Sequence, residues 1–253
     1  MPRYQSYIIC TSPRSGSTLL CKLLSATGKC GNPDSHFHEP SIADWLVDYG
    51  LSGGQFPNES AALTAIFDAA RKRGSGNTGM FGLRMQRHSF TYFMRQMEIL
   101  YPGFSSDSER IQAAFGNTLF IHLTRSNKLE QAISLLKATQ SGLWHLATDG
   151  TELERLTEPQ EPAYDAHAIT QNLVELTEFE YEWKAWFASE KLEPLHVTYD
   201  ELSGDPSEVL ARILVQLGLD RQIAENILPL TAKLADTTSR SWAERFLAEQ
   251  DQH

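Results

Sequence analysis

A short stretch of small and polar residues near the N-terminus has the composition of an anion-binding loop. An apolar segment at residues 4–10 leads into Ser12-Pro13-Arg14-Ser15-Gly16-Ser17-Thr18-Leu19, and a helical pattern follows. Small residues let backbone N–H groups turn inward around an anion, and a helix N-terminus adds partial positive charge. Arg14 would add a full charge and a planar donor fork. The stretch predicts a phosphate- or sulfate-binding loop, and an ordinary strand–helix turn is the alternative.

The loop lacks both common nucleotide-binding motifs, because no Lys follows Gly16 and the Gly-x-Gly-x-x-Gly spacing is absent. Pro13-Arg14-Ser15-Gly16-Ser17-Thr18 instead resembles the 5′-phosphosulfate loop of the sulfotransferases that use 3′-phosphoadenosine 5′-phosphosulfate (PAPS). The resemblance implies an α/β, P-loop-like fold and transfer of a sulfuryl group to a hydroxyl, with 3′,5′-ADP as product. It assigns PAPS binding to Arg14, Ser15, Gly16, Ser17, Thr18 and Leu19.

Two further segments match the same family. Arg125 ends the apolar segment 118–124, and the resemblance assigns it, together with Ser134, to the 3′-phosphate of PAPS. Ser134 follows Arg125 by nine residues, one more than is common in cytosolic members, and one residue turns a helical side chain by about 100°. Either the turn before the helix holds an extra residue, or Ser134 is a helical serine bonded to its own backbone. The segment from Val197 to Leu202 matches a structural motif of the family.

Within that family, the chain most resembles the carbohydrate sulfotransferases that act on trehalose in sulfolipid biosynthesis. The likeness rests on the phosphosulfate loop, the segment Asn32–Pro40, the helix that carries Gln131-Ala132-Ile133-Ser134, and the terminal Ser241-Trp242 and Arg245-Phe246. It implies trehalose as acceptor, sulfation of its 2-hydroxyl, and a homodimer.

Polar residues after the first helix suit a sugar acceptor, which calls for hydrogen-bonding side chains around an aromatic wall. The candidates are Asp34, His36, His38, Glu39, Trp45, Gln55 and Arg84, and a polar surface loop is the alternative. Glu39 is the leading general base, with His36 and His38 as rivals. Arg14 is expected to stabilise charge that develops on the sulfuryl oxygens. No metal is expected, because His36-x-His38 alone is a weak metal signature.

The elements that must position these residues alternate along the chain. Apolar segments predict strands at residues 4–10, 80–85, 118–124 and 195–199, and helical patterns cover 18–24, 43–49, 59–72, 129–139, 166–190 and 207–217. Such alternation predicts a parallel sheet with helices on both faces and ligands at the carboxyl ends of the strands. Residues 142–162 read as an acidic excursion in which residues 149–161 are expected to form a solvated loop, with a lid as the alternative, and the tail from residue 230 is left unassigned. We expect one domain over residues 1–253.

The composition of the chain argues against several classes of function. The chain has 22 Lys and Arg against 32 Asp and Glu, so its formal charge is −10, which argues against a nucleic-acid binder. Three cysteines without a Cys-x-x-Cys pair argue for a reduced, cytoplasmic protein. No apolar run reaches the roughly 18 residues of a membrane span, and the apolar segment at residues 7–10 is too short for a signal peptide. A small-molecule kinase and a non-catalytic nucleotide-binding protein are the competing functions.

Overall fold

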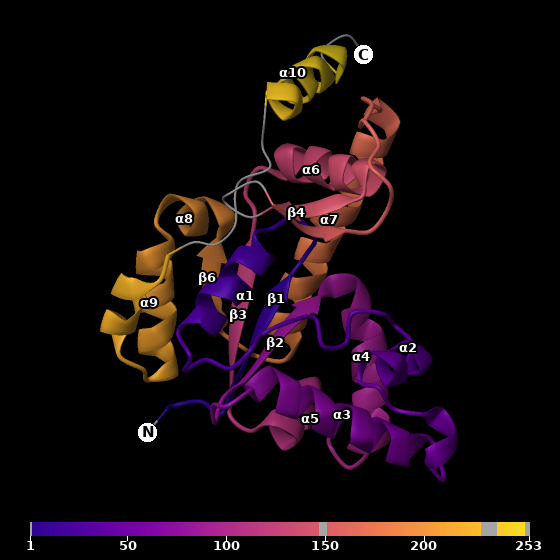
Figure 1. The fold of residues 1–253 in the computed structure, drawn as a ribbon, viewed down its shortest axis with the longest axis vertical. Coiled ribbons are helices and arrows are strands. Elements are labelled where there is room, and N and C mark those ends of the chain that lie inside the picture. Colours follow the sequence, from indigo (N-terminus) through magenta and orange to yellow (C-terminus); the bar gives the residue numbers. More distant parts are fainter. Residues whose placement is uncertain (1, 147–150, 229–236, 251–253) are drawn as a thin grey trace.

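A four-stranded parallel sheet forms the centre of the protein. The structure is a computed structural model that describes residues 2–146, 151–228 and 237–250 (Figure 1). The strands are β1 (Ser6–Thr11), β2 (Phe81–Gln86), β3 (Thr118–Thr124) and β6 (Leu195–Thr198), in the order β2-β1-β3-β6. All three pairings are parallel, so the carboxyl ends of the strands meet at one edge. The predicted α/β class is confirmed.

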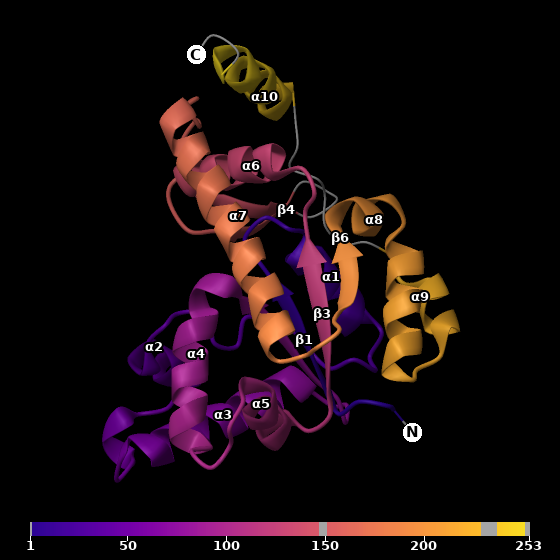
Figure 2. The same cartoon turned by 180° about the vertical axis from the view of Figure 1, so that it is seen from behind.

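Helices cover both faces of the sheet, as the alternation of side chains along β1 requires. Ile8 and Cys10 pack in one core with α3 (Glu59–Ser75), α4 (Arg87–Leu100), α5 (Asp107–Phe115) and α7 (Ala166–Ser189). Tyr7 and Ile9 pack in the other core with α1 (Ser17–Ala26), α9 (Pro206–Leu217) and the 3-10 helix η2 (Arg221–Asn226). Helix α1 lies in front of the strands in Figure 1, and α7 lies in front of them in Figure 2.

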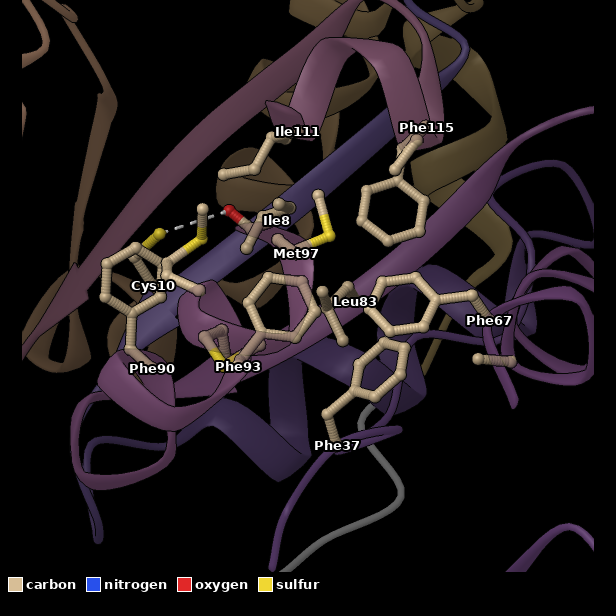
Figure 3. Close-up of a cluster of buried hydrophobic side chains, with 14 of the residues drawn as sticks. Ile8, Cys10, Phe37, Phe67, Leu83, Phe90, Phe93, Met97, Ile111 and Phe115 are labelled. Atoms are coloured by element: carbon tan, nitrogen blue, oxygen red, sulfur yellow. Dashed lines mark hydrogen bonds between the residues drawn. The ribbon is translucent and has the colours of Figure 1, made fainter. Parts of the chain in front are cut away.

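The core on the α4 side is built from stacked aromatic rings (Figure 3). Phe67 stacks on Phe93 and Phe115, with ring centroids 5.7 Å and 6.0 Å away, and Phe37 lies 4.7 Å from Phe67. Burying each such side chain contributes roughly 1.5–3 kcal/mol. The loop that follows α1 is therefore fixed to the scaffold through Phe37, close to the predicted acceptor residues.

The predicted helices are confirmed with small shifts at their ends. Besides α1, α3, α7 and α9 they are α2 (Ile42–Asp48) and α6 (Lys128–Ser141). The starts of α3 and α9 are close to prediction because capping residues mark them. Asn58 accepts a hydrogen bond from the Ala61 amide at the start of α3, and Asp205 caps α9 just before Pro206. Gly218 then ends α9 in the left-handed conformation, with φ of 77°.

Two regions contain structure that the sequence analysis did not predict. The acidic excursion includes an antiparallel ribbon of β4 (Leu143–Leu146) and β5 (Glu152–Arg155), so the loop expected at residues 149–161 is a strand at Glu152–Arg155. The unassigned tail forms α10 (Thr237–Gln250), which packs Trp242 and Phe246 into a third cluster with α6 and α7. Both views place α10 beside α6, beyond the carboxyl ends of the strands (Figures 1 and 2). No helix of the described residues is apolar over a length sufficient to cross a bilayer.

Acid should weaken the fold through His122 in β3. Its side chain is 1% exposed, its Nδ1 has no partner among the described residues, and burial, followed by the charge of His196, lowers its pKa to about 4. The unfolded chain, with a histidine pKa near 6.5, therefore binds more protons between pH 4 and 6.5. Stability falls as the pH falls through that window, by about 3 kcal/mol in total from this group.

Urea unfolding of wild type and His122→Asn at pH 4, 5, 6 and 7 measures this contribution. The free energy of unfolding of the variant should depend less steeply on pH, because the other titrating groups are common to both proteins. Parallel pH curves for the two proteins would contradict the role given to His122.

Candidate active site

The predicted anion-binding loop joins β1 to α1 at the carboxyl edge of the sheet. Arg14 and Gly16 both have positive φ, 61° and 87°, so the backbone turns sharply twice. A Cβ at Gly16 would lie 2.6 Å from Cδ2 of Tyr199, which follows β6, so only glycine fits there. Gln131 of α6 holds the loop from the other side, donating from Nε2 to Ser12 Oγ at 3.1 Å and to the Pro13 carbonyl at 2.7 Å. The loop shape is therefore fixed by two distant segments.

Arg14 lies at the centre of a group of polar contacts. Its Nε donates to Ser134 Oγ at 3.0 Å, and its Nη1 donates to the Trp144 carbonyl at 2.6 Å. Burial, followed by the charge of Arg125, lowers the pKa of Arg14 to about 10. Two guanidinium groups held this close out of water are destabilised by each other, and an anion between them would relieve that repulsion.

Arg125 and Ser134, the expected 3′-phosphate ligands, both lie beside Arg14. Arg125 is 6% exposed, contacts Glu130 at 2.9 Å, and its guanidinium lies 4.5 Å from the centre of the Tyr199 ring. Ser126 and Asn127 separate Arg125 from α6, and Asn127 caps the helix. The turn length therefore accommodates the nine-residue spacing, and Ser134 points to the cavity rather than only to its own helix.

A cavity of about 1280 Å³ opens at this edge of the sheet. One wall is a single face of α6, because its lining residues Ser134, Lys137, Ala138 and Ser141 have helical spacing. The loop contributes Pro13, Arg14, Gly16, Ser17, Thr18 and Leu19. The β4–β5 hairpin, α10, Arg125 and Tyr199 complete this part of the lining. Ser15 is fully buried under the loop against Thr11 and does not line the cavity.

The predicted acceptor residues divide into two groups. His38 and Arg84 line the cavity, together with Ser35. Asp34 is paired with Arg84 at 3.1 Å, and the Glu39 carboxylate lies 3.7 Å from His38 Nε2 with its side chain 59% exposed. Two of these side chains therefore line the cavity, whereas Asp34 and Glu39 are each paired with a lining residue and are not themselves part of the lining.

The other three predicted acceptor residues are not brought to the cavity. Trp45 is fully buried in the aromatic core, 5.1 Å from Phe37, because α2 buries its one large side chain there. His36 is 5% exposed, contacts the Asn32 carbonyl at 3.1 Å and has a pKa lowered by burial. Gln55 lies in the exposed 3-10 helix η1 (Gly53–Gln55). Trp45 and His36 are therefore buried and Gln55 is on the surface, and none of the three lines the cavity as expected.

Several cavity residues were missed by the sequence analysis. They include Trp144, His145 and Glu154 on the β4–β5 hairpin, Gln86 and His88, and a group on α10 that contains Arg240. The apolar–polar pattern after Gly142 was the available signal for β4. In the described part of the chain, no three His, Cys, Asp or Glu side chains come together in a group that could hold a metal ion.

Comparison with known proteins shows the family of the chain. The model of the Stf0 sulphotransferase family matches residues 6–249. The trehalose 2-sulfotransferase of Mycobacterium tuberculosis (strain ATCC 35801 / TMC 107 / Erdman) is 28% identical, and the alignment covers 96% of this chain and 94% of that protein. The trehalose 2-sulfotransferase of Mycolicibacterium smegmatis is also 28% identical, with 95% and 94% covered.

Solved structures show weaker similarity. The sulfotransferase domain of the Synechococcus PCC 7002 olefin synthase is 17% identical with a TM-score of 0.38, and covers 97% of this chain and 95% of that one. Sulfotransferase STF9 from Mycobacterium avium is 14% identical with a TM-score of 0.37, and covers 98% and 69%. On the family match over nearly its whole length, together with the loop geometry above, the chain belongs to the Stf0 sulphotransferase family.

Proposed function

We propose that this protein transfers the sulfuryl group of PAPS to the 2-hydroxyl of trehalose, giving trehalose 2-sulfate and 3′,5′-ADP. The observation that carries the proposal is the convergence of Arg14, Arg125 and Ser134 on one anion-binding loop at the carboxyl edge of the sheet. The names of the two bacterial relatives supply the acceptor and the sulfated position. The reaction would be an early, cytoplasmic step of sulfolipid biosynthesis, and the three free, buried cysteines suit a reducing compartment.

The residues present fit PAPS. The backbone of Gly16, Ser17 and Thr18 leads into the N-terminus of α1, which favours a phosphosulfate group. Arg125 and Ser134 would hold the 3′-phosphate, and Arg14 lies between the two groups of ligands. The cavity exceeds the roughly 300–1,000 Å³ of a pocket for one small ligand, so it has room for a nucleotide and a disaccharide.

The chemistry needs a base, an electrostatic clamp and alignment of the two substrates. The acceptor oxygen forms a bond to sulfur while the bond from sulfur to the 5′-phosphate oxygen breaks, and the electron pair leaves with 3′,5′-ADP. The Glu39 carboxylate takes the proton of the acceptor hydroxyl. Arg14 and the loop amides stabilise the charge that grows on the sulfuryl and bridging oxygens.

Ligand-induced thermal stabilisation tests the donor, because a ligand that binds the folded state raises its stability. A selective response to 3′,5′-ADP over ATP with Mg²⁺ is expected, and the reverse preference would favour a kinase. PAPS is then offered with a panel of disaccharides, and the product is examined for an added sulfuryl mass. Selective 3′,5′-ADP binding without turnover on any sugar would leave a non-catalytic nucleotide-binding protein.

We also expect a homodimer, which the resemblance to trehalose-directed sulfotransferases supports and which is the commonest symmetric assembly. Trp242 and Phe246 do not supply the interface in this structure, since they are 8% and 5% exposed within the chain. Light scattering should give twice the mass of one chain. A monomeric mass both with and without trehalose would remove this expectation.

A further inference from the structure

The hydroxyl group of Thr18 has two contacts with side chains from two different strands. Arg84 Nη1, from β2, lies 2.8 Å from Thr18 Oγ1, and His145 Nε2, from β4, lies 2.9 Å from it. All three residues line the cavity. Thr18 stands in the first turn of α1, directly after the turn at Gly16. The hairpin therefore reaches back to the loop that the proposed function assigns to the phosphosulfate group.

The direction of one of these bonds is fixed by chemistry. A guanidinium group has donors and no acceptor, so Arg84 must donate to Thr18 Oγ1. The hydroxyl has one hydrogen of its own. If His145 Nε2 carries no hydrogen, that hydroxyl hydrogen goes to the imidazole. If Nε2 carries a hydrogen, Thr18 accepts two bonds, and its hydrogen is left for a group in the cavity.

Charged groups around His145 favour a neutral ring with its hydrogen on Nε2. The carboxylate of Glu154, on β5, has its Oε2 3.4 Å from Nε2 and attracts a hydrogen there. Arg14 in the loop, Arg84 on β2 and Lys22 on α1 add to burial in lowering the pKa of His145 to about 3. The ring therefore stays neutral at physiological pH, and the choice left to it is which nitrogen carries the hydrogen.

We propose that His145 is a positioning residue for sulfuryl transfer, whose Nε2–H, directed by Glu154, turns the hydroxyl hydrogen of Thr18 towards the oxygens of the transferred group. The proposal rests on the proposed function, because it takes the loop as the phosphosulfate site. No proton is gained or lost, since the neutral ring with hydrogen on Nε2 is sufficient. A donor fixed in advance towards developing charge stabilises the transition state without reorganisation.

A double-mutant cycle tests whether His145 acts through Thr18. His145→Ala should lower kcat about tenfold, the scale of one misdirected hydrogen bond, with little change in KM for trehalose. His145→Gln, whose amide can donate from the same position, should stay within about threefold of wild type. In a Thr18→Ala background the His145→Ala change should have no further effect. If the kcat losses of Thr18→Ala and His145→Ala multiply in the double variant, the proposal is wrong. It is also wrong if the kcat of His145→Gln falls as far as that of His145→Ala.

Controls separate positioning from folding. His167→Ala alters an exposed histidine of α7 that does not line the cavity, and it should leave kcat unchanged. Thermal unfolding of each variant reports its stability. If His145→Ala does not fold, the cycle is run with Glu154→Gln and Thr18→Ala, because Glu154→Gln should lower kcat a few-fold through the same pair.

The tautomer of His145 is measured directly by ¹⁵N NMR of the imidazole, with 3′,5′-ADP bound. Hydrogen on Nε2 in wild type is the expected result, and hydrogen on Nδ1 overturns the proposal regardless of activity. Failure of the proposed function is a separate outcome: a wild type that binds 3′,5′-ADP but sulfates no sugar removes the transferase assignment, while the NMR result still decides whether His145 can direct Thr18.

Discussion

Glu39→Gln is expected to lower kcat by about 10²–10⁴-fold, the usual scale for the loss of a general base. Glutamine keeps the size and hydrogen bonding of the side chain and removes its basicity. The Glu39 carboxylate is well exposed and lies 3.7 Å from Nε2 of His38, which lines the cavity. PAPS binding, measured by calorimetry, should change little, because the expected donor ligands lie on the loop and on α6.

Two comparisons make the Glu39 result decisive. Glu225→Gln removes an exposed carboxylate from η2, away from the cavity, and should keep wild-type turnover. His38→Ala tests the rival that remains at the cavity, since His36 is buried elsewhere. Near-normal turnover in Glu39→Gln combined with its loss in His38→Ala would make the histidine the base and leave Glu39 to position the sugar.

Arg125→Ala should weaken PAPS binding by about 10²-fold, because a charge-assisted contact to a phosphate contributes roughly 1.5–3 kcal/mol or more when buried. Arg125 is 6% exposed, so its charge is little screened by solvent. The affinity for trehalose should stay close to that of wild type. Calorimetric titrations with PAPS and with trehalose measure the two affinities separately.

The loss of PAPS affinity in Arg125→Ala should come from the missing contact with the 3′-phosphate. Adenosine 5′-phosphosulfate, which lacks that group, should bind wild type and Arg125→Ala with similar affinity. Arg221→Ala, which removes an exposed arginine paired with Glu208, is the matched control and should bind PAPS normally. Equal PAPS affinities in wild type and Arg125→Ala would contradict the assignment.

The central fold was predictable because its signals are local. The strands are short apolar segments, and caps such as Asn58 and Asp205 mark the starts of α3 and α9. Helix α4 was missed because it starts directly after β2 without a side-chain cap. The start of α5 did carry a capping box, Ser106 with Glu109, that the sequence analysis left unused.

The candidate site was predictable only in part, for a different reason. The residues placed by a strand end, such as Arg14 and Arg125, are fixed by the parallel sheet and meet at its edge. Trp45 lies in a short helix and packs against Tyr92 of α4, and His36 lies in a loop and stacks on Phe81 of β2, so distant elements decide where both side chains point. His145 lies on β4, whose pattern after Gly142 is local, but its contact with Thr18 of α1 joins segments far apart in the sequence and has no local signal.

The close approach of Tyr199 to Gly16 has a consequence for the order in which the protein forms. Gly16 precedes Tyr199 by 183 residues, so the loop is synthesised well before the ring that packs on it. Strand β1 likewise lies between β2 and β3 in the sheet, and both of these strands come later in the sequence. Contacts between segments so far apart form slowly, and the chain emerges from the ribosome residue by residue. A nascent chain that ends before Tyr199 therefore lacks the ring that packs on Gly16, which is one of the two distant contacts that fix the shape of the loop between β1 and α1.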